Sequence, residues 1–545
     1  MCMKIKSRLQ CSDTTFIICI SLFITLFQNT RFLTKGWDIV GFDSLRALLF
    51  SASMLALLFC CLNVIFSLLL LPYLRKSVAI IFILTGAVIN YFMYSFNIVI
   101  DANMTDNALQ TNLNETLDLV SIKMVLWIVC LGIIPSIIVA ITQITPTQSI
   151  KKFITFKAIN IIASTLAIVF IAFFFYRDYA PFFRNNKDMM KMLVPSNAVA
   201  SLIKNISDGI EARKPFETIG LDAKKGEKIT GQPKKTLVIL VLGETARAEN
   251  FSLGGYQRDT NPLLSKRSNL TYFDNVSSCG TATAVSLPCM FSNMTRKDYS
   301  AIEAKHQENV LDILQRANVS VLWRDNDSGC KGACDRVPNQ NSTRLMLPEF
   351  CSDGACKDEI LLDKLDDYIQ KLDNDGIIVL HQMGSHGPTY YQRYPAAQRK
   401  FDPTCDTKQI QDCDKVKLVN TYDNSIVYTD YILDKTISLL EKNSDKFATS
   451  MIYVSDHGES LGENGMYLHG APYAIAPSQQ THVPMMIWTS DDYRNSQKLN
   501  QDCLSKEAKQ NTFSHDNLFH SLLGIFDIQT NQYKPELDMF RSCRQ

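Results

Sequence analysis

The chain has 545 residues and a formal net charge of +1, with 55 Lys and Arg residues against 54 Asp and Glu residues. This near balance excludes a strongly basic chain and gives no case for binding a nucleic acid or another polyanion, so we expect no nucleic-acid partner. The length predicts two or more domains. Apolar residues are concentrated in the first third, whereas the remainder has the composition of an ordinary globular protein.

Five apolar segments in the first third are long enough to cross a hydrocarbon core of about 30 Å as helices. They cover residues 14–34, 47–72, 77–100, 122–142 and 153–176. Three basic residues, Lys4, Lys6 and Arg8, precede the first segment, which has no clear small-residue cleavage site. We therefore predict an uncleaved membrane anchor rather than a signal peptide.

The basic residues of the short connections predict the orientation of these spans. Lys4, Lys6 and Arg8 place the N-terminus in the cytoplasm, and the pairs Arg75-Lys76 and Lys151-Lys152 place two later connections there as well. The connection 101–121 contains acidic residues and should lie outside. The first connection departs mildly from this pattern, with Arg31, Lys35 and Arg46 against Asp38 and Asp43. An odd number of spans then delivers the rest of the chain to the outer side.

Residues 177–235 are polar and mixed, and they predict a linker between a membrane domain and a soluble domain. Ala198 to Ile206 could form a short helix that lies on the membrane surface or bridges the two domains. Lys224 to Lys235 contains Gly226, Gly231 and Pro233, a composition that favours a flexible tether.

From Thr236 onward, short apolar strands alternate with helices. Strands are predicted at 236–242, 319–324, 376–380, 450–454 and 483–489, and helices at 308–317, 359–372 and 417–441. This alternation predicts an α/β domain with a mainly parallel sheet and helices on both faces. In such a sheet, ligands bind beyond the carboxyl ends of the strands.

Three of these strands run directly into residues that ligate metals. The first precedes Glu244, the third runs into His381 and His386, and the fourth ends at Asp456-His457. Glu244, Asp456 and His457 offer oxygen and nitrogen donors that suit zinc best, with manganese as the alternative. We expect one metal crevice along one edge of the sheet, although a surface Asp-His turn would give the same dipeptide.

A metal site of three ligands leaves one position for a reacting oxygen. The hydroxyl-rich segment Gly280 to Ser286 can supply a nucleophile, because a hydroxyl on zinc loses its proton near neutral pH. A plain loop or helix cap would have the same composition. The residue types alone do not choose among the candidates Thr245, Thr281, Thr283 and Ser286.

Further candidates surround this set. His381, His386 and His469 lie in loops near the strand ends and could bind a second metal, hold a phosphate or protonate a leaving group. Lys331 could neutralise an anionic substrate. The remaining histidines that we consider are expected to be structural: His306, His482, His515 and His520.

The 16 cysteines divide between the two halves of the chain. Those before residue 131 are expected to be unpaired small hydrophobic residues. The ten later ones lie in an oxidising compartment and predict disulfides. Four pairs are close neighbours in the sequence: Cys279 and Cys289, Cys330 and Cys334, Cys351 and Cys356, and Cys405 and Cys413. Cys503 and Cys543 are left over and form the fifth pair. A zinc knuckle built on Cys330, Cys334, Cys351 and Cys356 is the alternative.

Five motifs occur in an order that is specific for one enzyme family: Gly243–Arg247, Ser278–Thr283, Trp323–Asn326, Gly384–Tyr390 and Ser455–Ser460. The chain resembles the lipid A phosphoethanolamine transferases, bacterial inner-membrane enzymes that include those conferring polymyxin (colistin) resistance. They belong to the alkaline phosphatase and sulfatase superfamily. The resemblance covers nearly the whole chain. It implies a five-helix transmembrane domain (1–176), a linker with a bridging helix (177–235) and a periplasmic α/β catalytic domain (236–545).

The resemblance also implies the roles of individual residues. It makes Glu244, Asp456 and His457 ligands of one tightly bound Zn²⁺ and allows a second. It makes Thr283 the nucleophile and fourth ligand. His386 and His469 match positions that contact the substrate phosphate or a second zinc, Lys331 matches a substrate-contacting lysine, and His381 matches a histidine near the site. Asp327 stands at a substrate-contacting position where some members have Asn.

The implied reaction transfers phosphoethanolamine from phosphatidylethanolamine to lipid A or lipopolysaccharide through a phosphoethanolamine-threonine intermediate. The enzyme is expected to be a monomer among the lipids of the inner membrane. Transfer to a core sugar, or a phosphoglycerol transferase of the lipoteichoic acid synthase type, are the alternatives. A membrane-tethered sulfatase is disfavoured, because Thr283 does not lie in the C/S-x-P-x-R pattern of sulfatase nucleophiles.

Overall fold

The computed structural model describes residues 10–98, 104, 117, 119–145, 149–195, 215–352 and 355–544. The chain forms two compact units, the first from Met1–Ala102 with Val120–Lys204 and the second from Asn103–Leu119 with Asn205–Gln545. The predicted helix at Ala198 to Ile206 lies outside the described residues.

The first unit is built from apolar helices. Four of its described helices are long and apolar enough to cross a membrane, and a bent pair raises the number of spans to five if the pair counts as one. The helices are α1 (Asp13–Phe23), α2 (Thr30–Val40), α3 (Leu45–Leu69), α4 (Arg75–Phe96), α7 (Ile122–Ile128), α8 (Ile134–Ile141) and α9 (Ile150–Asn185). A π-helical turn, Val129–Ile133, joins α7 and α8 into one span.

The first predicted span is not a straight helix. A helix that includes α1 and the π-helical turn Ile24–Gln28 meets α2 at an angle of 61°. The break lies at Asn29, whose side-chain amide donates to the carbonyls of Ile24 and Val194, while its Oδ1 accepts from the Val194 N–H. A polar side chain that bonds the backbone in this way replaces helical hydrogen bonds and permits the bend.

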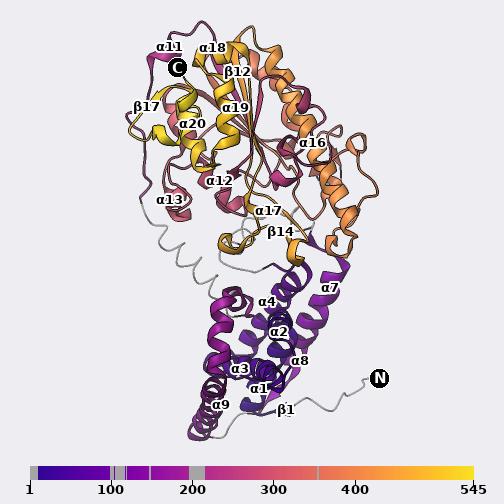
Figure 1. Cartoon of the computed structure of the whole chain (residues 1–545). Helices are drawn as coiled ribbons and strands as arrows, with labels where there is room; N and C mark the ends of the chain where they lie inside the picture. Colours follow the sequence, from indigo (N-terminus) through magenta and orange to yellow (C-terminus); the bar gives the residue numbers. More distant parts are fainter. Residues whose placement is uncertain are drawn as a thin grey trace, which may run out of the picture. The chain divides into compact units, whose positions relative to one another are not determined.

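The second unit contains a seven-stranded sheet in the order β5-β15-β12-β4-β11-β7-β8 (Figure 1). The strands are β4 (Lys235–Gly243), β5 (Leu270–Phe273), β7 (Ser320–Asp325), β8 (Asn339–Asn341), β11 (Gly376–His381), β12 (Phe447–Ser455) and β15 (Met485–Thr489). The five strands from β12 to β8 are parallel, whereas β15 and β5 are antiparallel to their neighbours. The mainly parallel sheet is therefore confirmed.

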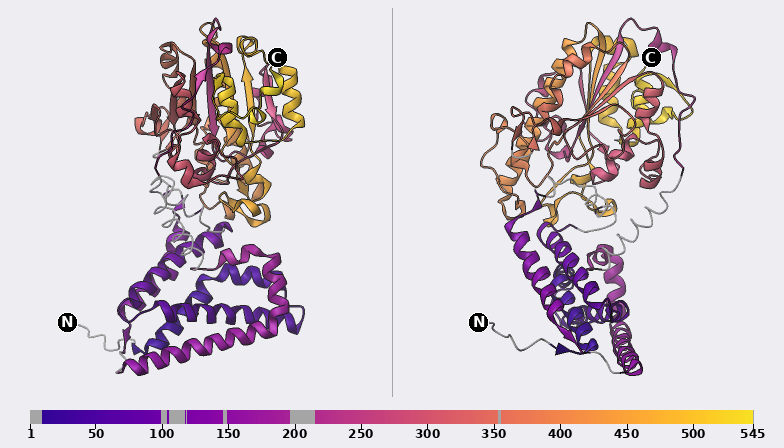
Figure 2. Two further views of the ribbon diagram at one scale, coloured as in Figure 1. Left: turned by 90° about the vertical axis from the view of Figure 1, so that its left-hand side faces the viewer. Right: turned by 180° about the vertical axis from the view of Figure 1, so that it is seen from behind.

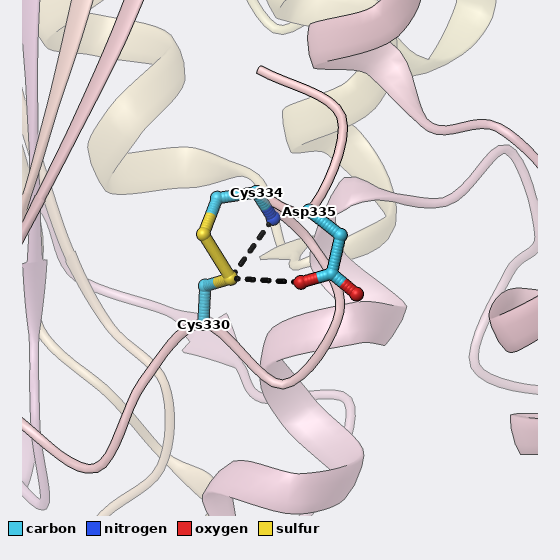
Figure 3. Close-up of side chains that lie close together, drawn as sticks. All are labelled: Cys330, Cys334 and Asp335. Atoms are coloured by element: carbon cyan, nitrogen blue, oxygen red, sulfur yellow. Dashed lines mark hydrogen bonds between the residues drawn. A yellow bond between two sulfur atoms is a disulfide. The ribbon is translucent and has the colours of Figure 1, made fainter. Parts of the chain in front are cut away.

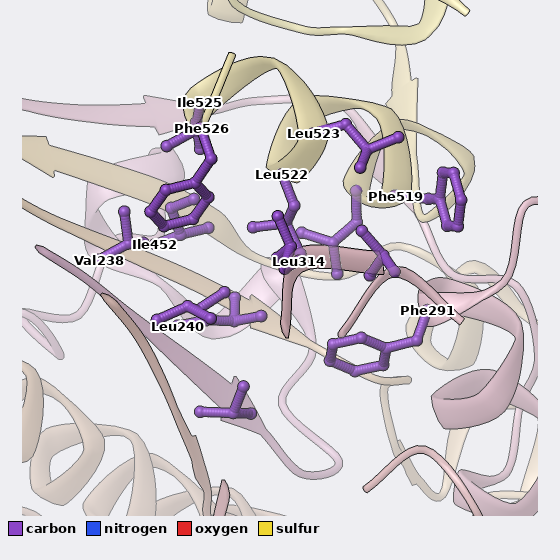
Figure 4. Close-up of a cluster of buried hydrophobic side chains, with 14 of the residues drawn as sticks. Val238, Leu240, Phe291, Leu314, Ile452, Phe519, Leu522, Leu523, Ile525 and Phe526 are labelled. Carbon is purple, nitrogen blue, oxygen red and sulfur yellow. The ribbon is translucent and has the colours of Figure 1, made fainter. Parts of the chain in front are cut away.

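Helices cover both faces of this sheet, as Figures 1 and 2 show. The long helix α16 (Lys415–Lys442) lies on one face. The other face carries α12 (Thr283–Phe291), α19 (Gln501–Gln510) and α20 (Asp516–Ile525). The apolar residues of α14 (Val310–Arg316) lie in the same buried cluster as those of α20. Between the sheet and α20, Val238, Leu240 and Ile452 lie in one buried cluster with Leu522 and Phe526 (Figure 4). This apolar layer fixes the strands whose ends form the site.

Two local predictions are wrong. The helix expected at 359–372 is a 3₁₀ turn, Asp358–Leu362, followed by α15 (Leu365–Gln370), because Lys364 between them has a φ of 51° that no continuous helix allows. The expected tether at Lys224 to Lys235 is ordered. Its strand β3 (Lys224–Lys225) pairs with β17 (Ile528–Gln529), and Lys225 Nζ lies 2.6 Å from a carboxylate oxygen of Asp375.

Disulfide bonding in the second unit is confirmed. The structure joins Cys279 to Cys289, Cys330 to Cys334, Cys351 to Cys356, Cys405 to Cys413, and Cys503 to Cys543. Figure 3 shows the Cys330–Cys334 bridge beside Asp335. Sulfurs bonded to each other cannot act as thiolate ligands, so the zinc knuckle is excluded.

Candidate active site

The ends of three adjacent strands form the centre of the site. Glu244 follows β4 directly, His381 is the last residue of β11, and Asp456-His457 follow β12. Because β4 pairs in parallel with both neighbours, His381 lies opposite Leu242 and Ser455 lies opposite Gly243. The register therefore places the metal-ligand residues side by side at one sheet edge, as parallel topology requires.

Four side chains converge on one point. Thr283 Oγ1 lies 3.2 Å from each carboxylate oxygen of Glu244 and 3.4 Å from His457 Nε2. His457 Nε2 lies 3.4 Å from Glu244 Oε1 and 3.3 Å from Asp456 Oδ2. Zinc bonds of about 2.0–2.1 Å in a tetrahedron separate the ligand atoms by about 3.3 Å. The four groups thus have the spacing of a tetrahedral ligand set.

Hydrogen bonds orient these groups for coordination. His457 Nδ1 donates to the Gly458 carbonyl over 2.9 Å, which fixes the neutral tautomer and leaves a lone pair on Nε2. Asp456 Oδ1 accepts from the backbone N–H groups of Thr245 and His457, whereas Oδ2 accepts from no described residue. Burial lowers the pKa of His457 and keeps the ring neutral. A buried carboxylate oxygen that accepts no hydrogen bond from the described residues, such as Asp456 Oδ2, is stabilised by a bound cation.

The surroundings distinguish Thr283 from the other hydroxyl candidates. Thr281 Oγ1 donates to the Ala471 carbonyl over 2.6 Å, and Ser286 Oγ donates to the Asp456 carbonyl over 2.6 Å. Of the four candidates, Thr283 is the one whose hydroxyl contacts both Glu244 and His457. Thr283 is also the first residue of α12, where the helix dipole favours an anion.

Two imidazole rings, those of His469 and His386, extend from the ligand set. The ring centroid of His469 lies 4.5 Å from that of His457 and 5.3 Å from that of His386. Burial lowers the pKa of His469 to about 4 and that of His386 well below its ordinary value, so both rings are neutral near pH 7. Glu459, which we did not select from the sequence, lies 3.2 Å from His469 Nδ1. Glu459 lies two residues after His457 in the motif Ser455–Ser460, and this position is the feature of the sequence that could have identified it.

His381 occupies the other side of Glu244. Its Nδ1 is hydrogen-bonded to Asp325 Oδ2 over 2.9 Å, a partner that the sequence analysis did not select although it belongs to a quoted motif. His381 Nε2 lies 4.0 Å from Glu244 Oε2 and 3.9 Å from Asp327 Oδ2. Lys331 lies in the short disulfide-closed loop, its Nζ 2.8 Å from Ser328 Oγ, and its charge contributes to the lowered pKa of His386.

The four histidines expected to be structural all bond to the backbone. His515 bridges two parts of the site, because its Nδ1 accepts from the Cys279 N–H and its Nε2 is bonded to the Ser455 carbonyl. The other three bond to backbone groups of Ile302, Asp274 and Lys534, namely His306, His482 and His520.

Comparisons with known proteins agree with this geometry. A family described as "Sulfatase" matches residues 236–528, and a second, "Phosphoethanolamine transferase EptA/EptB", matches residues 58–210. Phosphoethanolamine transferase EptA of Escherichia coli K12 is 46% identical over 545 residues, which is 100% of each chain. The chain belongs to the phosphoethanolamine transferase family.

Solved structures extend this match to the whole fold. The integral membrane protein lipooligosaccharide phosphoethanolamine transferase A from Neisseria meningitidis is 43% identical, with a TM-score of 0.96 over 98% of this chain and 100% of that one. The periplasmic domain of EptC from Escherichia coli, solved in complex with Zn, shares the fold of the second unit at 20% identity and a TM-score of 0.50. It covers 61% of this chain and 91% of that one.

The transferase is thus an integral membrane enzyme of the lipid A and lipopolysaccharide type, with a periplasmic catalytic domain. Phosphoethanolamine as the transferred group is favoured over the phosphoglycerol alternative by both the family match and the full-length relative.

Proposed function

We propose that the transferase moves phosphoethanolamine from phosphatidylethanolamine to a phosphate of lipid A, with Thr283 as the covalent carrier. The observation that supports this proposal is the convergence of the Thr283 hydroxyl with Glu244, Asp456 and His457 within 3.4 Å contacts. All the groups belong to one chain, so a monomer is sufficient for the chemistry.

Zn²⁺ is the cofactor that fits this donor set best, with Glu244, Asp456, His457 and Thr283 as the residues that would hold it. The EptC domain of the same fold, solved with Zn, supports that choice. Bound there, the ion would lower the pKa of a ligating hydroxyl and offset negative charge on the phosphoryl group.

In the first step, Thr283 Oγ attacks the phosphorus of phosphatidylethanolamine in line with the diacylglycerol oxygen. A Thr283 O–P bond forms and the bond from phosphorus to diacylglycerol breaks. The hydroxyl proton, which the geometry directs toward Glu244, ends on the diacylglycerol oxygen. The step therefore needs no external acid, and the neutral rings of His386 and His469 do not have to supply a proton.

In the second step, a phosphate oxygen of lipid A attacks the same phosphorus from the side that diacylglycerol has left. The Thr283 O–P bond breaks, and Thr283 regains a proton from the acceptor phosphate or from water. Neutral rings of His386 and His469 can orient the phosphoryl oxygens and the ammonium group, while Lys331 supplies positive charge near them. The added ammonium group lowers the negative charge of lipid A, which weakens attraction to cationic peptides such as polymyxin.

The covalent carrier can be tested directly. Full-length protein in detergent is incubated with headgroup-labelled phosphatidylethanolamine in the absence of acceptor, quenched in acid and analysed by peptide mass spectrometry. We expect the label on the peptide that contains Thr283 in the wild type and no label in Thr283→Ala. Label retained by Thr283→Ala, or lipid A modified as fully as by the wild type in expressing cells, would show that another residue carries the group.

A further inference from the structure

A second set of potential ligands lies against the first. One ligand atom each from Glu244, Asp327 and His381 lies within 4.8 Å of the others, and all three side chains are buried. The two sets share Glu244. Neither set includes His386 or His469, whose rings lie on the His457 side of the site.

The carboxylate of Glu244 is oriented to serve both sets. Its Oε1 lies 3.4 Å from His457 Nε2, whereas its Oε2 lies 4.0 Å from His381 Nε2. Oε1 is thus the oxygen nearer His457 and Oε2 the oxygen nearer His381, while both lie 3.2 Å from Thr283 Oγ1. A carboxylate in this orientation is the bridge of two-metal sites, where the ions lie about 3.5–4 Å apart.

His381 is held in the tautomer that a metal ligand needs. Asp325 Oδ2 accepts from Nδ1 over 2.9 Å, and it also accepts from Trp323 Nε1 over 2.9 Å. The lone pair of Nε2 then faces Glu244 and Asp327. Although His381 is buried completely, Nε2 makes no hydrogen bond to any described residue, and neither does Asp327 Oδ1. A carboxylate that orients the distal nitrogen of a ligating histidine is a recurrent feature of metal sites.

Charge balance also favours a second cation. Four buried carboxylates lie in this part of the site, from Glu244, Asp325, Asp327 and Asp456. A distance of 3.9–4.0 Å from Nε2 to two carboxylate oxygens is too long for a hydrogen bond, and it exceeds the separation of about 3.3 Å in a tetrahedral zinc site, so the three side chains would have to move inward to bond one cation.

We propose that Glu244, Asp327 and His381 form a second divalent-cation site, bridged to the first through Glu244. The donors, two carboxylates and one imidazole, suit Zn²⁺ or Mn²⁺. Its cation offsets the charge of Asp327 and of the outer oxygen of Glu244, and so reduces repulsion of the anionic phosphodiester. The proposal rests on the metal centre under Proposed function, but not on the covalent threonine.

A proton is the competing occupant of this site. Burial opposes protonation of His381, yet the carboxylates of Asp325 and Asp327 raise its pKa to about 9. In the absence of a cation, Nε2 would therefore carry a proton, and the space between the three side chains would need no ion. Metal stoichiometry separates these two states.

The experiment uses the full-length protein in detergent, stripped with chelator, reloaded with Zn²⁺ and dialysed, with metal counted by mass spectrometry. We expect two ions per chain in the wild type and one in Asp327→Asn, which preserves side-chain shape. The matched control, His386→Asn, removes a neighbouring imidazole outside the proposed set and should still hold two. Thermal unfolding of each variant verifies that it is folded.

The outcomes separate the two proposals. No ion in the folded wild type overturns the first metal centre as well, whereas one ion in both wild type and Asp327→Asn overturns the second site alone. Loss of the second ion in His386→Asn, with retention in Asp327→Asn, would move the site to the histidine pair and refute this assignment. Reloading with Mn²⁺ adds a spectroscopic test. We expect exchange-coupled electron paramagnetic resonance in the wild type and an uncoupled signal in Asp327→Asn, and uncoupled signals in both refute the shared carboxylate.

Discussion

Replacing Gly384 by Ala should displace Glu244 and impair the metal centre. A Cβ at Gly384 would lie 2.6 Å from the Glu244 carbonyl oxygen and 2.9 Å from its nitrogen. Ordinary contacts begin near 3.4 Å, so the two backbones must separate by about 0.8 Å. The Glu244 backbone cannot yield freely, because its carbonyl accepts from the Ser385 N–H over 2.9 Å. A shift of this size at a catalytic group typically costs about 10²-fold in rate.

The backbone conformation of Gly384 adds a second cost that a control must remove. Gly384 has a φ of +53°, and alanine in that region costs about 1 kcal/mol. Gly255 has a φ of +97°, and nothing lies within 4 Å of its added Cβ, so Gly255→Ala carries backbone strain without the collision. We expect phosphoethanolamine transfer and zinc retention to fall in Gly384→Ala and to stay near wild type in Gly255→Ala. Equal zinc affinity and rate in Gly384→Ala and wild type would refute the reasoning.

Two further predictions concern stability. Burial lowers the pKa of His520 to about 4 from its ordinary 6.5. The unfolded chain therefore binds more protons between these values, and stability that is complete above pH 6.5 falls by about 3 kcal/mol as the pH drops to 4. His520→Gln should abolish this decrease in the free energy of unfolding, measured by urea unfolding between pH 6.5 and 4. An unchanged pH dependence in the variant would contradict the assignment. Replacing Cys503 and Cys543 together by Ala releases a 40-residue loop and should cost about 4 kcal/mol, against about 2 kcal/mol for the four-residue separation of Cys330 and Cys334. Equal losses in the two double variants would argue against the loop-entropy explanation.

The sheet and the positions of its ligands could be predicted because they follow from local patterns. Apolar runs identify strands, and parallel strands present their carboxyl ends at one edge, so Glu244, His381 and Asp456-His457 had to lie near one another. The choice of Thr283 could not follow from composition. It depends on the Thr281 hydroxyl being bonded to the carbonyl of Ala471, 190 positions away, which no local pattern encodes.

The segment from Lys224 to Lys235 was mispredicted for a related reason. Its glycines and lysines suggest a mobile tether, but Lys225 is bonded to Asp375 across 150 positions and Ile229 is buried. Composition describes what a segment can do by itself. The partner that removes its freedom belongs to a different part of the chain, so tertiary contacts override the local preference.

The proposed nucleophile and the proposed ligands come from different elements, so their mutual distance depends on ties between α12 and the sheet. The Cys279–Cys289 bridge closes the segment that contains Thr283, and Ser286 Oγ bonds the Asp456 carbonyl over 2.6 Å. His515 links the Cys279 N–H to the end of β12 through its two ring nitrogens. Each tie is modest by itself, about 1 kcal/mol for a neutral hydrogen bond. Together they hold the Thr283 hydroxyl against carboxylates and an imidazole on other elements, and His515 contributes to this arrangement through its two backbone bonds.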